Sequence, residues 1–529
     1  MQPLASSEEP RWTQAAHPLW RWLLVCAGAA NVLPLWSARH LPFTDLPQHA
    51  AAIATLRHFW DPAWKAQQYF TLALSQTQYL LYYLAGALLA VPFGTAERAN
   101  LVLLSVIGAS LPFALRSLLR ALRADERLAL FAAPLFWSQP LLIGFFNYLA
   151  ALPLLLWSLA LCVRQAEAPA RRTALALAAA SLGLFYLHLS AFLFFAPAAA
   201  IATWLLPRPA PSGAAPRALL RALGQALRRL PRRLWWILPS AVAAVLFLAR
   251  SPVMNPGAVG WQAPRRVVLE DVADALRSLP AALLDIWRGP QDEWCLLGLL
   301  AAAALLAWPG QTVAEEPGQP WRRGIAAAWV AWAFALYFFF PQTIGWLWQL
   351  NERYAIVAAL LAPLLLRPRP SLRGALPLLL VAVIAAGAGG IARRKIVAFD
   401  REAEGFDELI AQAAPGRRLI GLIPEYGSSV AGFAPFLHYA SLYRARAGGV
   451  ASFSFAELPQ SPLRYRPEAA PPPKPQGWEW QPELYRNDVD GEYYDYVLLR
   501  GRVRAFDPNA PGPRWHLVGQ AGLWQLWSK

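Results

Sequence analysis

Long apolar blocks place the strongest constraint on what this chain can fold into. Between residues 18 and 392 they recur at the length that one helix needs to cross a bilayer, about 20 residues, and short arginine-rich or proline-rich breaks separate them. Hydrophobic residues make up 57% of the chain and charged residues only 15%, whereas globular chains average about 45–50% and about 25%. The sequence therefore predicts a polytopic α-helical membrane protein.

About eleven blocks are candidate transmembrane spans by their length. Thr77–Phe93 is also apolar enough to cross, but we expect it to lie in the membrane interface or to re-enter. With a cytoplasmic N-terminus, this choice puts every arginine-rich loop up to residue 373 on the cytoplasmic side, as the positive-inside rule requires. Arg393, Arg394 and Lys395 are the exception. The predicted spans are 18–37, 96–115, 128–143, 147–163, 173–187, 189–206, 234–249, 294–309, 324–340, 346–366 and 374–392.

The remaining long segments are expected on the periplasmic side of a bacterial inner membrane. They are a first outer loop, 38–95, a later outer loop, 250–293, and residues 393–529, which follow the membrane domain 1–392. Short strands alternate with helical patterns in the last segment, which predicts a small α/β domain. The expected elements are strands Arg417–Ile423, Val450–Phe455, Tyr494–Leu499, His516–Val518 and Leu523–Trp527, helices Asp400–Ala414 and Ala434–Ala445, and a proline-rich loop or lid, Ala469–Gln476.

Composition and motifs exclude several classes of protein. The net charge of +16 comes mostly from arginines in the breaks between blocks, where they set topology and build no nucleic-acid surface. Cys26, Cys162 and Cys295 lie in apolar blocks, so we expect small buried hydrophobes rather than a disulfide framework. No nucleotide-binding glycine loop is present, and no histidine or carboxylate cluster has metal spacing, so no cofactor is expected.

Asp45 is the first candidate for chemistry, in the segment His40–His49 of the first outer loop. One interpretation makes it the N-cap of an amphipathic helix on the membrane surface, with Pro47 in the first turn and Gln48 completing a capping box. The functional interpretation adds that this carboxylate acts as general base for an acceptor hydroxyl, with His49 one turn later on the same face. The two interpretations are compatible.

Glu352 and Arg353 are the second candidate. Only 13 residues separate Arg353 from Arg367, which is about 20 Å of helix and short of the roughly 30 Å hydrocarbon core. We therefore expect the helix to extend back through Trp346–Leu350, which buries Glu352 and Arg353 in the outer leaflet. There they either form an internal pair or snorkel to the interface, or the arginine binds a lipid-borne phosphate. We favour the phosphate.

Further polar residues face the same compartment in this topology. His188 lies at the turn between two closely spaced spans, where a structural hydrogen bond competes with a catalytic role. Asn147 and Tyr148 occupy the outer turn before the fourth span. Arg265 and Arg266, in the later outer loop, are expected to meet lipid headgroups rather than a substrate phosphate.

This pattern resembles the GT-C superfamily of glycosyltransferases that use polyprenyl-phosphate sugars, in particular the protein mannosyltransferases and aminoarabinose transferases. Asp45 lies in a long first outer loop, Tyr79–Tyr83 belongs to an apolar helix before the second span, and Gly94–Asn100 leads into that span. An arginine-rich loop follows, a later outer loop has a helical pattern, and Arg353-Tyr354 opens a late span ahead of an outer domain. The resemblance covers most of the chain and concerns its architecture.

The resemblance implies an inverting transferase that moves a sugar from a polyprenyl-phosphate donor to a hydroxyl of a glycan, lipid or protein acceptor. Asp45 would deprotonate the acceptor, with His49 as a second catalytic residue, and Arg353 would bind the donor phosphate. The full set of expected substrate-binding residues is Arg353, Glu352, His188, Asn147, Tyr79 and Gln78.

The chain departs from the family pattern at three places. Leu46 follows Asp45 where an acidic pair is common, Asn147 stands where the second outer loop often has an acid, and the juxtamembrane helix starts with Gln76-Thr-Gln78 instead of a basic residue and prolines. These departures argue against a divalent metal and leave the donor unidentified. The alternatives are a lipid or polysaccharide transporter or flippase, for which we find no internal repeat, and a non-catalytic membrane scaffold of the same fold.

Overall fold

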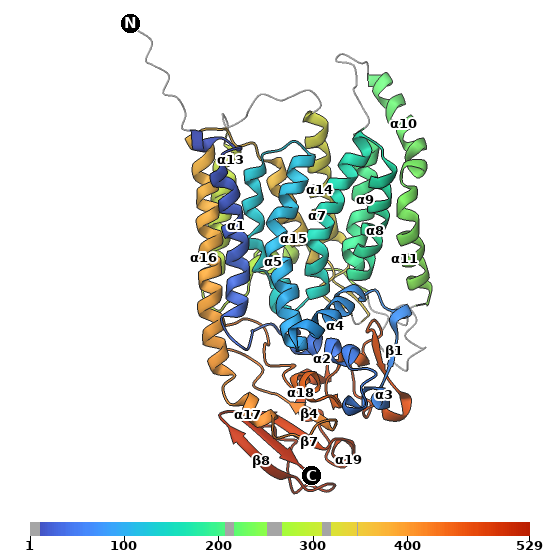
Figure 1. Ribbon diagram of the computed structural model, residues 1–529, viewed down its shortest axis with the longest axis vertical. Helices are drawn as coiled ribbons and strands as arrows, with labels where there is room; N and C mark the ends of the chain where they lie inside the picture. The colour runs from blue at the N-terminus through green and yellow to red at the C-terminus, as the bar shows by residue number, and fades with distance from the viewer. Residues whose placement is uncertain (1–10, 207–215, 251–266, 309–318, 346) are drawn as a thin grey trace.

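The computed structural model describes residues 11–206, 216–250, 267–308, 319–345 and 347–529. Figure 1 shows a bundle of long helices with the C-terminal residues packed against one end, while the helix Pro18–Val32 (α1) begins at the other end. Arg265, Arg266 and Trp346 fall outside the described residues, so the expectations for them stay predictions.

Long helices form the bundle, and most of them lie close to predicted spans; the arginine-rich α10 and the helix α12 match none of these spans. By length and composition, four of the described helices can cross a membrane, namely α1 with the turn that follows it, α5, α7 and α16, and a bent pair made by the end of α10 and α11 gives a fifth candidate. The count of about eleven spans stays a prediction. The helices are α1 (Pro18–Val32), α5 (Ala96–Ala121), α7 (Phe146–Glu167), α8 (Arg171–Leu187), α9 (Leu189–Leu205), α10 (Pro216–Arg233), α11 (Leu238–Arg250), α12 (Val272–Leu284), α13 (Gln291–Ala307), α14 (Gln319–Phe339), α15 (Arg353–Leu361) and α16 (Leu372–Glu402).

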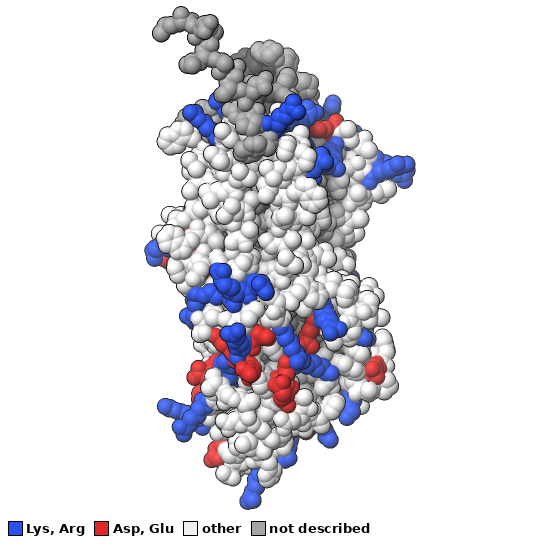
Figure 2. Space-filling view, turned by 60° about the vertical axis from the view of Figure 1, so that its left-hand side comes forward, with Lys and Arg blue, Asp and Glu red and all other residues white. Residues whose placement is uncertain are grey.

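The bundle surface is apolar between two charged ends. Figure 2 shows a broad band with few charged side chains, and large side chains such as Val106 on α5 and Val383 on α16 are exposed. Lipid contact stabilises an apolar surface of this kind. Arg127 donates to the carbonyls of Thr13 and Arg369, which gathers these segments at the end of the bundle opposite the C-terminal residues (Figure 1).

Residues 128–143 cross the bundle, but not as the continuous α-helix that we expected. They fold as η5 (Glu126–Ala132), η6 (Pro134–Phe136) and α6 (Gln139–Ile143), and nearly all of them are buried. Proline lacks the N–H that an α-helix needs and clashes with the preceding turn, so Pro134 and Pro140 break the ladder. Irregular backbone is tolerated at membrane depth where protein surrounds it.

The prediction that the helix of Arg353 extends back through Trp346–Leu350 was wrong for residues 347–350, which are not helical. α15 begins at Arg353 and passes into η9 (Ala362–Leu365). Upstream, Gly345 and Gln349 have φ angles of 61° and 51°, a left-handed conformation that ends a right-handed helix. The short strand β3 (Thr343–Ile344) pairs there with β2 (Val267–Val268). Arg353 is therefore the first residue of its helix.

The first predicted outer loop forms a layer between the bundle and the C-terminal residues (Figure 1). It contains α2 (Leu46–Arg57), α3 (Ala66–Tyr69), β1 (Phe70–Leu72) and α4 (Leu81–Phe93). α4 has 13 residues, about 20 Å of helix, and is thus shorter than the roughly 30 Å of a hydrocarbon core.

The structure corrects the expected amphipathic helix and its capping box. α2 is buried on all sides from Pro47 to Thr55, and the Asp45 side chain makes no capping hydrogen bond. Gln48 instead donates to the Phe453 carbonyl at 2.5 Å and accepts from the Phe455 N–H at 3.2 Å. Packing between the bundle and the C-terminal residues therefore replaces the membrane surface as the environment of α2.

The C-terminal residues form a five-stranded sheet in the order β5-β4-β7-β9-β8. β4 runs parallel to β5 and β7, while β9 is antiparallel to β7 and β8. Each strand overlaps a predicted one, but of the expected helix Ala434–Ala445 only α18 (Ser441–Ala447) forms, and α16 runs without a break past residue 393. The strands are β4 (Arg418–Leu422), β5 (Val450–Ala451), β7 (Tyr496–Arg500), β8 (His516–Ala521) and β9 (Trp524–Ser528); α17 is Phe406–Ile410, α19 is Asp490–Tyr493, and β6 (Leu463–Tyr465) pairs with β1.

Candidate active site

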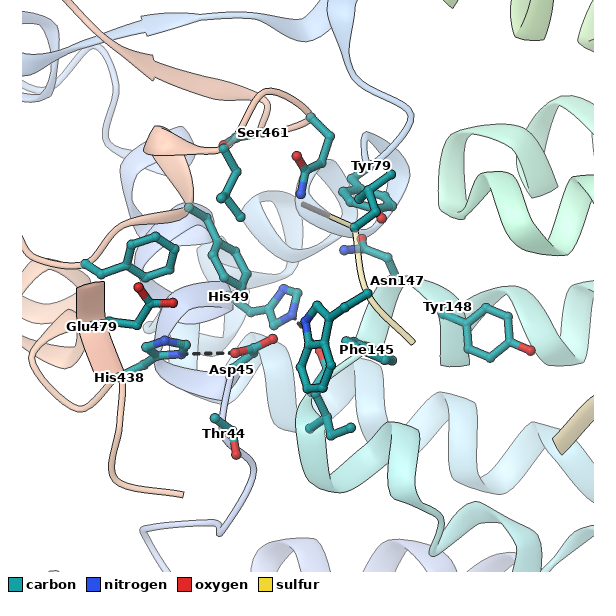
Figure 3. A pocket seen from close by; sticks show the side chains of 18 of the residues that line it. Thr44, Asp45, His49, Tyr79, Phe145, Asn147, Tyr148, His438, Ser461 and Glu479 are labelled. Carbon is teal, nitrogen blue, oxygen red and sulfur yellow. Dashed lines mark hydrogen bonds and ion pairs between the residues drawn. The ribbon is translucent and has the colours of Figure 1, made fainter. Parts of the chain in front are cut away.

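A cavity of about 490 Å³ lies where the first predicted outer loop, the ends of the bundle helices and the C-terminal residues meet. Figure 3 shows side chains that line it. Glu352 and Gln78, which we expected to bind substrate, do not line it. Six of the predicted site residues do: Asp45, His49, Tyr79, Asn147, His188 and Arg353.

The turn that joins α6 to α7 positions Asp45. The N–H groups of Thr44 and Asp45 donate to the carbonyls of Leu142 and Ile143 at 2.9 and 3.0 Å. Gly144 has a φ of +102°, and a Cβ added there would lie 2.6 Å from the Cβ of Asp45. Only glycine satisfies both the dihedral angle and the close approach.

The same turn holds His49. Its Nε2 donates to the Gly144 carbonyl at 2.8 Å, and its ring packs 4.8 Å from that of Phe146. Burial lowers the pKa of His49 to about 4, although Asp45 opposes the shift. The ring is therefore neutral near pH 7, with an unprotonated Nδ1 that has no hydrogen-bond partner among the described residues.

His438 and Glu479 complete the carboxylate side of the cavity. His438 Nδ1 lies 3.0 Å from Asp45 Oδ1, in an ion-pair contact rather than an aligned hydrogen bond, and Glu479 lies beside His438 (Figure 3). Burial raises the pKa of Glu479, His438 lowers it, and Asp45 raises it further. No sequence pattern indicated either residue. His438 falls inside the helix expected at Ala434–Ala445, and the one available signal was that the chain has only 7 histidines.

Arg353 lies on another wall of the cavity and is only 6% exposed. Its Nη1 lies 3.1 Å from His188 Nε2, and its Nη2 donates weakly to the Trp348 carbonyl at 3.4 Å. The guanidinium carbon lies 4.5 Å from the Phe145 ring centroid, and Nε has no hydrogen-bond partner in the part of the chain that the structure describes. Among the described residues, none, Glu352 included, forms an ion pair with Arg353, which disfavours the internal-pair interpretation.

The hydrogen bonds of His188 show that its Nε2 does not accept a hydrogen bond from Arg353. His188 Nδ1 accepts from the Ser190 N–H at 3.1 Å, so the neutral ring carries its proton on Nε2, which faces the Tyr79 hydroxyl at 3.3 Å. A protonated Nε2 cannot accept from the guanidinium. Arg353 is therefore a buried cation whose donors lack an anionic partner, a state that a bound anion would stabilise.

The cavity lining thus contains two carboxylates, Asp45 and Glu479, and one guanidinium, Arg353. Asn147 and Tyr79 lie together, apart from His438 and Glu479, in Figure 3. In the part of the chain that the structure describes, no group of three or more His, Cys, Asp or Glu side chains is placed to hold a metal ion.

No protein-family model and no curated protein sequence matches this chain. The structure of ArnT from Cupriavidus metallidurans bound to undecaprenyl phosphate matches with a TM-score of 0.56 and 14% identity, over 97% of this chain and 98% of that chain. The arabinofuranosyltransferase AftD from Mycobacteria matches with a TM-score of 0.48 and 15% identity, over 97% of this chain and 42% of that chain. The Archaeoglobus fulgidus oligosaccharyltransferase matches with a TM-score of 0.41 and 13% identity, over 90% of this chain and 68% of that chain.

The chain therefore shares the fold of ArnT, a membrane-protein fold, in agreement with the architecture that the sequence pattern predicted. At this level of identity the match concerns the fold alone. The roles of the cavity residues follow from their own geometry.

Proposed function

We propose that this protein is a membrane glycosyltransferase that moves a sugar from a polyprenyl-phosphate donor to an acceptor hydroxyl. The observation that carries the proposal is that Asp45 and Arg353, from remote parts of the chain, line one cavity. A carboxylate that accepts a proton and a buried guanidinium that lacks an anion are the two groups that transfer away from a phosphate requires. The undecaprenyl phosphate bound to the structurally similar ArnT supports a lipid donor.

In this proposal Asp45 accepts the proton of the acceptor hydroxyl while the hydroxyl oxygen attacks the anomeric carbon of the donor sugar. The bond from the anomeric carbon to the phosphate oxygen breaks, and its electron pair leaves with the polyprenyl phosphate. Attack opposite the leaving group inverts the anomeric configuration. Arg353 binds the phosphate and stabilises the negative charge that develops on it.

Two residues position the base. The ion-pair contact of His438 orients the carboxylate of Asp45 from the C-terminal side, and the Gly144 turn holds its backbone. Because His438 belongs to the C-terminal residues, the site is complete only when they are docked on the bundle. We propose that this end faces the periplasm, since the arginine-bearing loops gather at the opposite end, as the positive-inside rule requires of the cytoplasmic side.

Asp45→Asn tests the proposal. We expect transfer from a radiolabelled polyprenyl-phosphate sugar to an envelope extract, measured with the protein in nanodiscs, to fall by about 10²–10⁴-fold. Binding of undecaprenyl phosphate should remain, because Arg353 is untouched. Asp61→Asn is the matched control, since Asp61 belongs to the same loop and caps η3 (Pro62–Trp64).

Two results would count against a transferase. Transfer by Asp45→Asn at the wild-type rate would remove the base from the mechanism. Movement of labelled lipid across proteoliposomes, without any sugar transfer by the wild type, would favour the flippase alternative.

A further inference from the structure

Four aromatic rings form a row along the cavity wall. The Trp348 ring centroid lies 6.5 Å from that of Phe145 and 5.8 Å from that of Phe433, and the Phe433 centroid lies 5.6 Å from that of Trp480. The row starts at the ring beneath Arg353 and ends at the residue next to Glu479. Trp348 and Trp480 remain 42% and 37% exposed, so part of their surface is open to a ligand.

One charged residue lies at each end of the row: Arg353 covers the Phe145 ring, and Glu479 precedes Trp480 in the chain. Among the described residues that line the cavity, Arg353 is the only arginine or lysine. The lining also has the carboxylates of Asp45 and Glu479, which lie on either side of His438 (Figure 3). One guanidinium forms one bidentate phosphate contact, and the proposed donor occupies it. An acceptor bound beside Asp45 and Glu479 therefore meets two carboxylates, with the one lining guanidinium already occupied, so a phosphate near its reacting hydroxyl would be repelled.

We infer that the part of the cavity bounded by Phe433, Trp480 and Glu479 is a subsite for a neutral saccharide, which is the acceptor of the reaction. Aromatic faces cover the C–H face of a sugar ring, while carboxylates and amides accept from its hydroxyls. Ser461 and Gln476 add uncharged polar groups to the same lining. The role of the saccharide as acceptor rests on the proposed function, whereas its binding does not.

Binding measurements with the full-length protein in nanodiscs test the inference. The probes are uncharged tetrasaccharides of glucose, mannose and arabinose, and the same tetrasaccharides with one phosphate group. We expect the wild type to bind at least one uncharged probe and to bind its phosphorylated counterpart more weakly. Trp480→Ala should weaken the uncharged probe by about threefold to tenfold and leave the affinity for undecaprenyl phosphate unchanged.

Three variants serve as controls. Trp480→Phe keeps a stacking ring and should retain most of the affinity, which separates loss of stacking from loss of folding. Trp60→Ala removes a tryptophan that is 74% exposed and does not line the cavity, so it should have no effect. Glu479→Lys adds a cation, so it should raise the affinity for the phosphorylated probe, whereas Glu479→Gln should raise it less.

Each outcome decides the matter. Tighter binding of the phosphorylated probe by the wild type, no binding of any uncharged probe, or equal loss of lipid phosphate and saccharide in Trp480→Ala would overturn the subsite. If uncharged probes bind through Trp480 but Asp45→Asn and the wild type both lack transfer, the subsite stands and the transferase proposal fails. If transfer depends on Asp45 but goes to peptide or lipid hydroxyls without any effect of Trp480→Ala, the transferase stands and the subsite fails.

Discussion

Arg127 and Arg353 are both buried, at 3% and 6% exposure, at opposite ends of the same bundle. Arg127 forms an ion pair with Asp125 at 2.6 Å, donates to the carbonyls of Thr13 and Arg369, and stacks over an indole ring. Its charge is neutralised and its donors are used. Arg127 therefore joins three segments of the chain and has nothing left for a ligand.

Arg353 has the same chemistry and a similar degree of burial, but it lacks a carboxylate partner. Its contacts are the N–H side of the neutral His188 ring, the Tyr79 hydroxyl, a long hydrogen bond to the Trp348 carbonyl and the Phe145 ring. Desolvation of a charge is unfavourable unless an opposite charge compensates it. Burial alone therefore does not distinguish a structural arginine from a ligand-binding one. The distinction lies in whether other residues of the protein already pair with its N–H groups and neutralise its charge.

The largest effect that we expect from this contrast is on stability. Arg127→Ala should lower the free energy of unfolding by about 3–5 kcal/mol, because Asp125 and two carbonyls lose their partner. Arg353→Ala should change it by less than about 1 kcal/mol, since no ion pair is broken. Denaturant unfolding in detergent measures both, with Arg277→Ala, an exposed arginine paired with Asp274, as the control. Equal destabilisation by the Arg127 and Arg353 variants would break the comparison.

His49 is another buried group with unused hydrogen-bonding capacity, because its ring is neutral and its Nδ1 has no partner among the described residues. Its pKa is lowered to about 4 in the folded chain, against about 6.5 when unfolded. Between these values the unfolded chain binds the extra proton, so folding stability decreases as the pH falls from about 6.5 to about 4, by about 3 kcal/mol in total. Unfolding midpoints from pH 7 to pH 4.5 should fall less steeply for His49→Gln than for the wild type. Identical slopes would show that His49 is not held neutral.

The smallest expected effect is on lipid binding, and it tests most directly whether Arg353 binds a ligand while Arg127 does not. Arg353→Ala should weaken the binding of undecaprenyl phosphate by about 1.5–3 kcal/mol, roughly tenfold to a hundredfold. Arg353→Lys should restore part of the affinity, because lysine keeps the charge but not the planar fork. Native mass spectrometry in nanodiscs measures this, with Arg127→Lys as the matched control. A loss of the same size in Arg127→Lys would remove the functional distinction between the two arginines.

The sequence predicted which residues share the cavity better than it predicted their local structure. Asp45, Asn147, His188 and Arg353 were assigned to one face by counting spans and placing arginine loops, and they line one cavity. The expected capping box failed because Gln48 bonds the C-terminal residues instead. Side-chain partners remote in the chain competed with the local motif, and the sequence alone does not reveal them.

His438 shows the limit of local patterns most clearly. Residues 434–445 have helical spacing, yet α18 begins only at Ser441, and the turn before it brings His438 to Asp45. Glu352 and Gln78 were expected in the site, and both neighbour a cavity residue in the chain, but neither lines the cavity. A shift of one position along a helix or turn redirects a side chain, so adjacency in sequence predicts proximity to the site but not membership of it.

Local sequence patterns were enough to predict the coarse architecture: apolar length marks the membrane helices, arginines mark one end of the bundle, and alternating short strands mark the C-terminal sheet. Each of these properties depends only on residues that are close together in the chain, so a short stretch of sequence is enough to predict it. Only the tertiary structure decided that Arg353 lacks an anion while Arg127 has one, and that His438 contacts Asp45. Those facts depend on which donors and acceptors meet across segments far apart in the chain, and the packing of the whole molecule sets them.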